Sequence, residues 1–88
     1  MRYMVIEKYV HGPGPVYARF AERGRMLPSG LAYLESWIDA LELDRCFQLM
    51  EAEDPELLGE WMANWRDLVE FEVVPVIESS EAAAQSHG

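Results

Sequence analysis

The sequence predicts a single α+β domain with the ferredoxin-like order strand, helix, strand, strand, helix, strand over residues 1–78. Four segments alternate between two sets of side chains, as β-strands do, and two segments repeat apolar residues every three or four positions, as helices do. The chain has 88 residues, which is room for one domain. The expected result is a four-stranded antiparallel sheet with both helices on one face.

The first half of the chain contains a strand, a helix and a second strand. Alternation over Arg2–Tyr9 predicts the first strand, and the turn residues His11-Gly12-Pro13-Gly14 end it. Pro15 suits the first turn of a helix, and helical spacing continues to about Met26. Alternation returns over residues 31–39 and predicts the second strand.

The second half repeats this pattern. Residues 45–52 predict a third strand that forms a hairpin with the second. Asp54 and Pro55 predict a helix start, because the carboxylate can cap free N–H groups and proline at the first position loses no hydrogen bond. The apolar stripe of this helix is Leu58, Trp61, Met62, Trp65 and Leu68. A fourth strand follows over residues 69–77, where Pro75 predicts a sheet edge. Residues 79–88 form a polar C-terminal tail in which Ser80 can start a short helix.

One face of the predicted sheet has no helix to cover it. On the helix-covered face we place Phe47, Leu49, Phe71 and Val73, and on the open face Cys46, Gln48, Met50, Glu70, Glu72 and Val74. Such a mixed open face is too apolar for water and too polar for a sealed core. We therefore expect a homodimer in which a second sheet covers it.

Composition excludes several classes of function. Sixteen acidic and seven basic residues give a net charge of −9, so neither nucleic acid nor an anionic membrane is an expected partner. No apolar stretch is long enough to cross a bilayer. Cys46 is the only cysteine and the N-terminus has no signal-peptide pattern, which predicts a cytoplasmic protein.

Several segments of the chain resemble a family of small bacterial proteins known only as a domain of unknown function. The matching segments are Arg2–Ile6, Arg25–Pro28 with Gly30-Leu31, Ser36-Trp37, Arg45–Glu51 and Phe71–Val76. Proteins of this shape are grouped with the dimeric α+β barrels, in which two ferredoxin-like sheets close against each other. The resemblance implies the fold and the dimer, but no reaction. That superfamily includes cofactor-independent monooxygenases and isomerase-like enzymes, whose functional motifs this chain does not match.

Two residues are candidate catalytic groups. His11 follows the first strand in a loop and can exchange a proton near neutral pH. Glu72 shares a face with Glu70 and Gln48, a grouping that can raise the pKa of one carboxyl. The alternatives are a solvent-exposed loop histidine and a hydrated dimer interface. Cys46 lacks an adjacent base, which favours a small buried hydrophobic residue over a nucleophile.

Aromatic residues predict a ligand pocket between the second helix and the sheet. Its candidate ligand-binding residues are Trp37, Gln48, Trp61 and Trp65, with Tyr33 and Met62 nearby. The alternative for the helical tryptophans is ordinary core packing. Arg19, Arg23 and Arg25 can bind a carboxylate ligand or pair with neighbouring acids. No cysteine or histidine cluster has metal-ligand spacing and no phosphate-binding loop is present, so we expect neither a metal nor a cofactor.

The sequence leaves three functions open. The first is a homodimeric module that binds a small apolar or aromatic ligand. The second is a cofactor-independent enzyme, similar to a monooxygenase or an isomerase, in the same pocket. The third is a purely structural role as a partner of another protein. Whether the chain is an enzyme stays open at this point.

Overall fold

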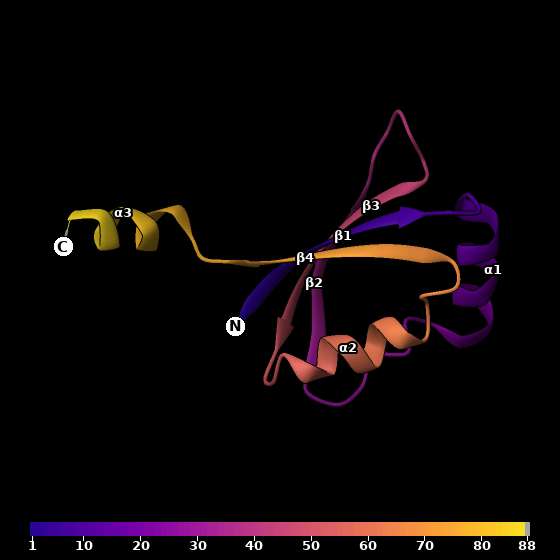
Figure 1. Cartoon of the computed structure of the whole chain (residues 1–88), viewed down its shortest axis with the longest axis horizontal. Helices are drawn as coiled ribbons and strands as arrows, with labels where there is room; N and C mark the ends of the chain where they lie inside the picture. Colours follow the sequence, from indigo (N-terminus) through magenta and orange to yellow (C-terminus); the bar gives the residue numbers. More distant parts are fainter. Residues whose placement is uncertain (88) are drawn as a thin grey trace.

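The computed structural model describes residues 1–87 and has the predicted element order (Figure 1). The elements are β1 (Arg2–Tyr9), α1 (Pro13–Arg23), β2 (Leu31–Ile38), β3 (Arg45–Ala52), α2 (Glu56–Ala63), β4 (Val69–Val76) and α3 (Ser79–His87). The strands form one sheet in the order β2-β3-β1-β4, with every neighbouring pair antiparallel. The ferredoxin-like α+β fold is thereby confirmed. Gly88, the last residue of the predicted tail, lies outside the described residues.

The core lies between the sheet and the two helices α1 and α2. Val5 of β1 and Met50 of β3 are both 0% exposed. Leu58 and Trp61 enter the core from α2, and Val16 enters from α1. We call the side of the sheet that packs against α1 and α2 the helix face and the other side the open face. The strand residues buried in the core all lie on the helix face.

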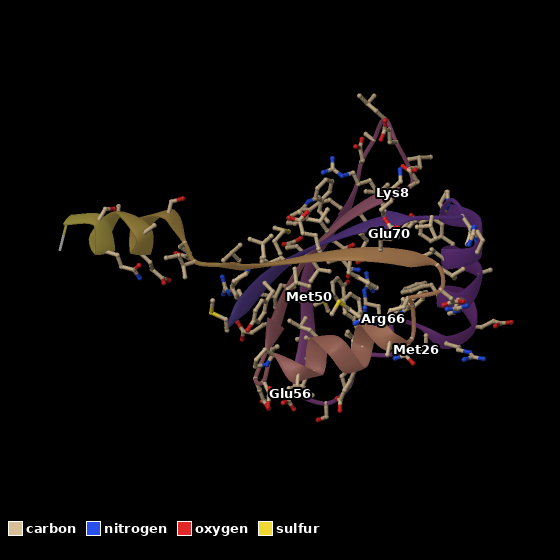
Figure 2. All side chains as sticks on the ribbon, in the orientation of Figure 1. Lys8, Met26, Met50, Glu56, Arg66 and Glu70 are labelled. Carbon is tan, nitrogen blue, oxygen red and sulfur yellow. The ribbon has the colours of Figure 1, made fainter. Side chains whose placement is uncertain are left out.

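The predicted faces of β3 are wrong. The register pairs Val5 with Gln48 and Tyr3 with Met50, so Cys46, Gln48 and Met50 lie on the helix face. Phe47 and Leu49 therefore lie on the open face. Figure 2 shows Met50 on the α2 side of the sheet, with Lys8 and Glu70 on the opposite side. Alternation shows which residues share a face, but only the strand register decides which face that is.

The faces of β4 are as predicted. Phe71 and Val73 pack against the core, whereas Glu70, Glu72 and Val74 are exposed on the open face. The predicted grouping of Gln48 with the two glutamates is therefore wrong, because Gln48 lies on the helix face. β4 is an edge strand, as Pro75 predicts.

Both main helices end earlier than predicted. α1 also begins two residues before the predicted Pro15, so Pro13 and Gly14 belong to the helix and not to the predicted turn. Gly24, with φ 66°, ends α1, and its N–H donates to the Phe20 carbonyl at 2.7 Å. The Asp54 carboxylate accepts the Glu56 N–H at 2.9 Å, which is the expected helix start for α2. α2 ends at Ala63, and Trp65 lies in the turns that follow.

The C-terminal segment stands apart from the rest of the chain. Figure 1 shows β4 continuing past the sheet toward α3, which lies away from the other elements. Residues 79–86 of this helix are all exposed. An isolated helix of this length is marginal in water, so contact with another molecule would stabilise it. Within residues 1–87, no helix has both the length and the hydrophobicity that crossing a membrane requires.

Candidate functional site

A cavity of about 250 Å³ lies between α1, α2 and the helix face of β1, β2 and β3. Its apolar walls are Val16, Tyr17, Phe20, Ile38, Trp61 and Trp65. Its polar lining is Glu7, Tyr9, Arg25, Ser36, Cys46 and Gln48. Tyr17 and Phe20 are more than two-fifths exposed, so they form part of its rim. The cavity is therefore an apolar, partly open pocket with a small polar region on the sheet.

A buried carboxyl group lies in this polar region. Glu7 is 4% exposed and lies on β1 between Cys46 of β3 and Phe71 of β4. The Gln48 amide, itself 7% exposed, donates a hydrogen bond from Nε2 to Glu7 Oε2. Gln48 Oε1 is buried and accepts no hydrogen bond from the described residues. A buried polar atom without a partner is costly, so this oxygen favours a ligand with a donor group or a bound water.

Burial raises the pKa of Glu7 from 4.5 to about 7. Desolvation is the main cause, while the hydrogen bond from Gln48 and the charge of Arg25 act in the opposite direction. Burial likewise raises the pKa of Tyr9 and Cys46, so both stay protonated at neutral pH. Glu7 is therefore the group in the pocket that can take or give a proton under physiological conditions.

Two tryptophans fix the backbone of Arg25 beside the pocket. The indole N–H of Trp61 donates to the Arg25 carbonyl at 3.0 Å, and that of Trp65 donates to the same oxygen at 3.2 Å. The next residue, Met26, has φ 59°, a conformation that costs a non-glycine residue about 1 kcal/mol or more. Backbone strain next to a pocket is typical of segments that position a functional side chain.

The Arg25 side chain lies among aromatic rings. Its guanidinium carbon is 3.6 Å from the centroid of the Tyr33 ring and 5.2 Å from that of Phe20. Stacking on the ring faces leaves the guanidinium N–H groups free to bind an acceptor. Arg25 thus brings a positive charge to the pocket that contains Glu7.

A second arginine joins α1 to the segment after α2. Arg19 forms two hydrogen bonds of 2.7 Å with the Asp67 carboxylate and one of 2.9 Å with the Asn64 carbonyl. Its guanidinium lies 5.8 Å from the Trp65 ring centroid. Because these contacts hold one wall of the pocket, Arg19 is a structural residue rather than a ligand contact.

The structure brings together three of the four predicted ligand-binding residues. Gln48, Trp61 and Trp65 line the pocket. Trp37 is 49% exposed and pairs with Phe47 on the open face, away from the pocket. Whether any of them binds a ligand stays a prediction.

The two predicted catalytic residues lie outside the pocket lining. His11 is exposed in the turn after β1. Glu72 is exposed on the open face, where it is the register partner of Ile6. Their catalytic roles stay predictions, but Glu72 cannot act together with Gln48, which lies on the opposite face of the sheet.

The pocket contains two charged residues, Glu7 and Arg25. Glu7 was not predicted as a site residue, whereas Arg25 was one of three arginines for which carboxylate binding was one of two alternatives. A signal for Glu7 was present in the sequence, because it shares a face with Val5 and Tyr9 and a carboxylate between two core residues needs a partner. Arg25 had only its place among three arginines as a signal. No local pattern could indicate that its backbone meets Trp61 and Trp65 across the fold.

The comparisons with known proteins identify a family but no activity. No curated protein and no solved structure matches the chain. One family, described as Domain of unknown function (DUF3303), matches residues 1–87, nearly the whole chain. The chain therefore belongs to the DUF3303 family.

Proposed function

We propose that this chain is a homodimeric small-molecule-binding protein whose ligand, apolar or aromatic, occupies the pocket between α1, α2 and the sheet. The observation that carries the proposal is the buried Glu7–Gln48 pair in an otherwise apolar pocket. A purely structural core gains nothing from a buried carboxyl group, because desolvation costs more than its one hydrogen bond returns. A few convergent polar groups on apolar walls are typical of ligand sites.

The size and the shape of the pocket restrict the ligand. Pockets for drug-sized molecules measure about 300–1,000 Å³. At about 250 Å³ this pocket suits a smaller molecule with one or two rings. The indoles of Trp61 and Trp65 offer flat surfaces, which favour an aromatic body over a branched aliphatic one.

The open face supports the homodimer. Its central residues are the apolar side chains Met4, Ile6, Phe47 and Leu49, with Trp37, Val74 and Val76 around them. Trp37 and Val74 are 49% and 37% exposed. Monomeric proteins rarely expose so large a continuous apolar patch. A second copy of the same face is the partner that a two-fold dimer supplies.

The area of this face reaches the minimum expected of a biological interface. Four strands of eight residues each span roughly 19 by 26 Å, or about 500 Å² per copy. Two copies would bury about 1,000 Å², which is at the threshold for a biological interface and below the roughly 1,200–2,000 Å² of most stable ones. Closure of two sheets in this way is the arrangement of the dimeric α+β barrels, the superfamily to which we assign the chain. A cytoplasmic location is part of the same proposal, since the single Cys46 is buried and has no disulfide partner in the chain.

Thermal unfolding with a panel of small aromatic compounds tests the ligand-binding function. A compound that binds only the native state raises the melting temperature by about 5 °C or more at ten times its Kd. Ser36→Phe fills the pocket from β2 and should abolish the shift, whereas Ser29→Phe, in an exposed turn outside the pocket lining, should keep it. If no compound shifts the native chain, or if Ser36→Phe keeps the full shift, this function is wrong.

A second candidate function is proton transfer, as in a cofactor-independent isomerase. It is favoured by the pKa of Glu7 at about 7, since a general base works best near the operating pH. Glu7 would remove a proton from carbon next to a ligand carbonyl and return it to a different carbon, so that no other reactant is consumed. An enzyme of the monooxygenase kind would consume oxygen as well.

Exchange of ligand protons in D₂O, followed by NMR, tests this candidate. Aryl ketones that bind the pocket should exchange their α-protons for solvent deuterium when the native chain is present. The rate should fall by about 100-fold or more in Glu7→Gln. Oxygen uptake in the same samples separates an oxygenase from an isomerase, and equal exchange in both proteins excludes proton transfer by Glu7.

A further inference from the structure

We propose that the ligand of this pocket is a carboxylic acid with a flat apolar body, bound as the carboxylate to Arg25 beside a protonated Glu7. This inference rests on the ligand-binding function proposed above and specifies the chemical class of the ligand.

The first support is that Arg25 has no acidic partner. Among residues 1–87, the ion pairs of Arg2, Lys8 and Arg19 all use acids at the surface, and none involves Arg25. Its side chain contacts the Tyr33 and Phe20 rings instead. An arginine whose flat faces are stacked keeps its N–H edge for a planar acceptor, and a carboxylate is the acceptor that fits two of these groups at once.

The second support is that Arg25 is held in place before any ligand arrives. Its carbonyl accepts the indole N–H groups of Trp61 and Trp65, and Met26 keeps its left-handed backbone conformation next to it. The same two tryptophans form apolar walls of the cavity. Because Arg25 lines the same cavity, a ligand that stacks on these walls can place its polar end at the guanidinium. Preorganisation of this kind lowers the entropic cost of binding.

The third support is the protonation state of the other charged group. The ionisable groups around Glu7 are Tyr9 on β1, Cys46 on β3, Tyr17 on α1 and Arg25 after α1. Glu7 has a pKa of about 7 in spite of the positive charge of Arg25, because it is buried. When Glu7 is protonated, Arg25 is the one charge left among these groups at neutral pH, and a ligand carboxylate neutralises it. When Glu7 is ionised, its carboxylate competes with the ligand for Arg25 and repels the ligand carboxylate.

Calorimetric titration with matched acids and amides tests this assignment. The probes are benzoate and phenylacetate, with benzamide and phenylacetamide as neutral analogues of the same shape. The acids should bind at least about 10-fold more tightly than the amides at pH 6, because a hydrogen bond to a charged group is worth more than one to a neutral group. The acids should also bind about 10-fold more weakly at pH 8 than at pH 6, since ionisation of one group with a pKa near 7 opposes them.

Two variants with one control separate the roles of the two charges. Arg25→Gln should weaken the binding of the acids by about 10-fold or more, whereas the affinity for the amides should change by less than about 3-fold. Arg23→Gln, at an exposed position outside the pocket lining, should change neither. Glu7→Gln should remove the difference between pH 6 and pH 8 while the acids still bind.

The outcomes distinguish this inference from the proposed function. If the native chain binds the amides as tightly as the acids, or if Arg25→Gln binds the acids as tightly as the native chain does, the ligand is not a carboxylate, but the pocket still binds small aromatic molecules. If neither acids nor amides bind to the native chain, the carboxylate assignment is wrong. The proposed function then depends on the wider aromatic panel and on Ser36→Phe.

Discussion

The two faces of the sheet depart from the usual pattern of apolar residues inside and polar residues outside. The covered face contains buried polar groups, and the open face contains apolar side chains. The helix face buries Glu7 and Gln48 beside Arg25, whereas the open face leaves Phe47 and Leu49 half-buried, with no helix of residues 1–87 packed over them. Both arrangements cost free energy in an isolated chain, the first through desolvation and the second through hydration of apolar surface. The functions proposed above give each face a partner that offsets this cost. The partner is a ligand or a proton for the helix face, and a second copy for the open face.

Truncation of Met50 tests whether β3 is oriented as described. Met50 is 0% exposed on the helix face, so Met50→Ala should lower the free energy of unfolding by about 3–4 kcal/mol, measured in urea. Its neighbour Leu49 is half-buried on the open face, and Leu49→Ala should cost less than about 1.5 kcal/mol. At protein concentrations where the chain is monomeric, a larger loss for Leu49→Ala than for Met50→Ala would contradict the observed register.

The buried carboxyl of the helix face should make stability depend on pH. The pKa of Glu7 is about 7 in the folded chain against an ordinary 4.5, so between these values the native state holds a proton that the unfolded state has lost. Stability therefore falls as pH rises from 4.5 to 7, by about 3 kcal/mol in total, and stays level above.

Glu7→Gln is the variant that tests this dependence. It should abolish the fall, whereas Glu72→Gln, exposed on the open face, should keep it. Asp67, whose pKa Arg19 lowers to about 2, affects stability only below pH 4 and does not interfere. A native chain whose unfolding free energy is constant from pH 4.5 to 7 would show that Glu7 is ionised in the fold.

A charge on the open face should break the dimer. Leu49→Asp buries a carboxylate in the proposed interface and should raise the dimer dissociation constant by about 100-fold, or about 2–3 kcal/mol. The matched control is Leu41→Asp, in the loop between β2 and β3, where the native leucine is 95% exposed. Analytical ultracentrifugation measures both. A native chain that stays monomeric at high concentration would exclude this interface.

Glycine substitutions give the smallest expected effect. Gly59 lies within α2, and a Cβ atom there meets nothing within 4 Å, so Gly59→Ala should stabilise the fold by about 1 kcal/mol. Gly30 has φ 90° and a Cβ there would lie 2.9 Å from Glu53 Oε2, so Gly30→Ala should destabilise it. Thermal unfolding distinguishes the two. Equal effects would show that helix propensity does not contribute at Gly59.

Much of the fold could be predicted from local pattern. Alternation located all four strands, and Asp54-Pro55 located the start of α2. The end of α1 was predicted too late, since Gly24 in a left-handed conformation stops the helix before Met26. The site was predicted only in part. Gln48, Trp61 and Trp65 line the pocket, and so does Arg25, one of the three arginines named as possible carboxylate-binding residues. Glu7 was missed, and Trp37 lies on the other face of the sheet.

The sequence by itself determined the elements, their order and the sets of side chains that share a face, because these follow from backbone geometry within each segment. Only the tertiary structure decided which face of β3 meets the helices, since the pairing of Val5 with Gln48 depends on strands 43 residues apart in the chain. It also decided that Arg25 lies beside Glu7, because the two indole N–H groups that fix Arg25 come from residues 36 and 40 positions away.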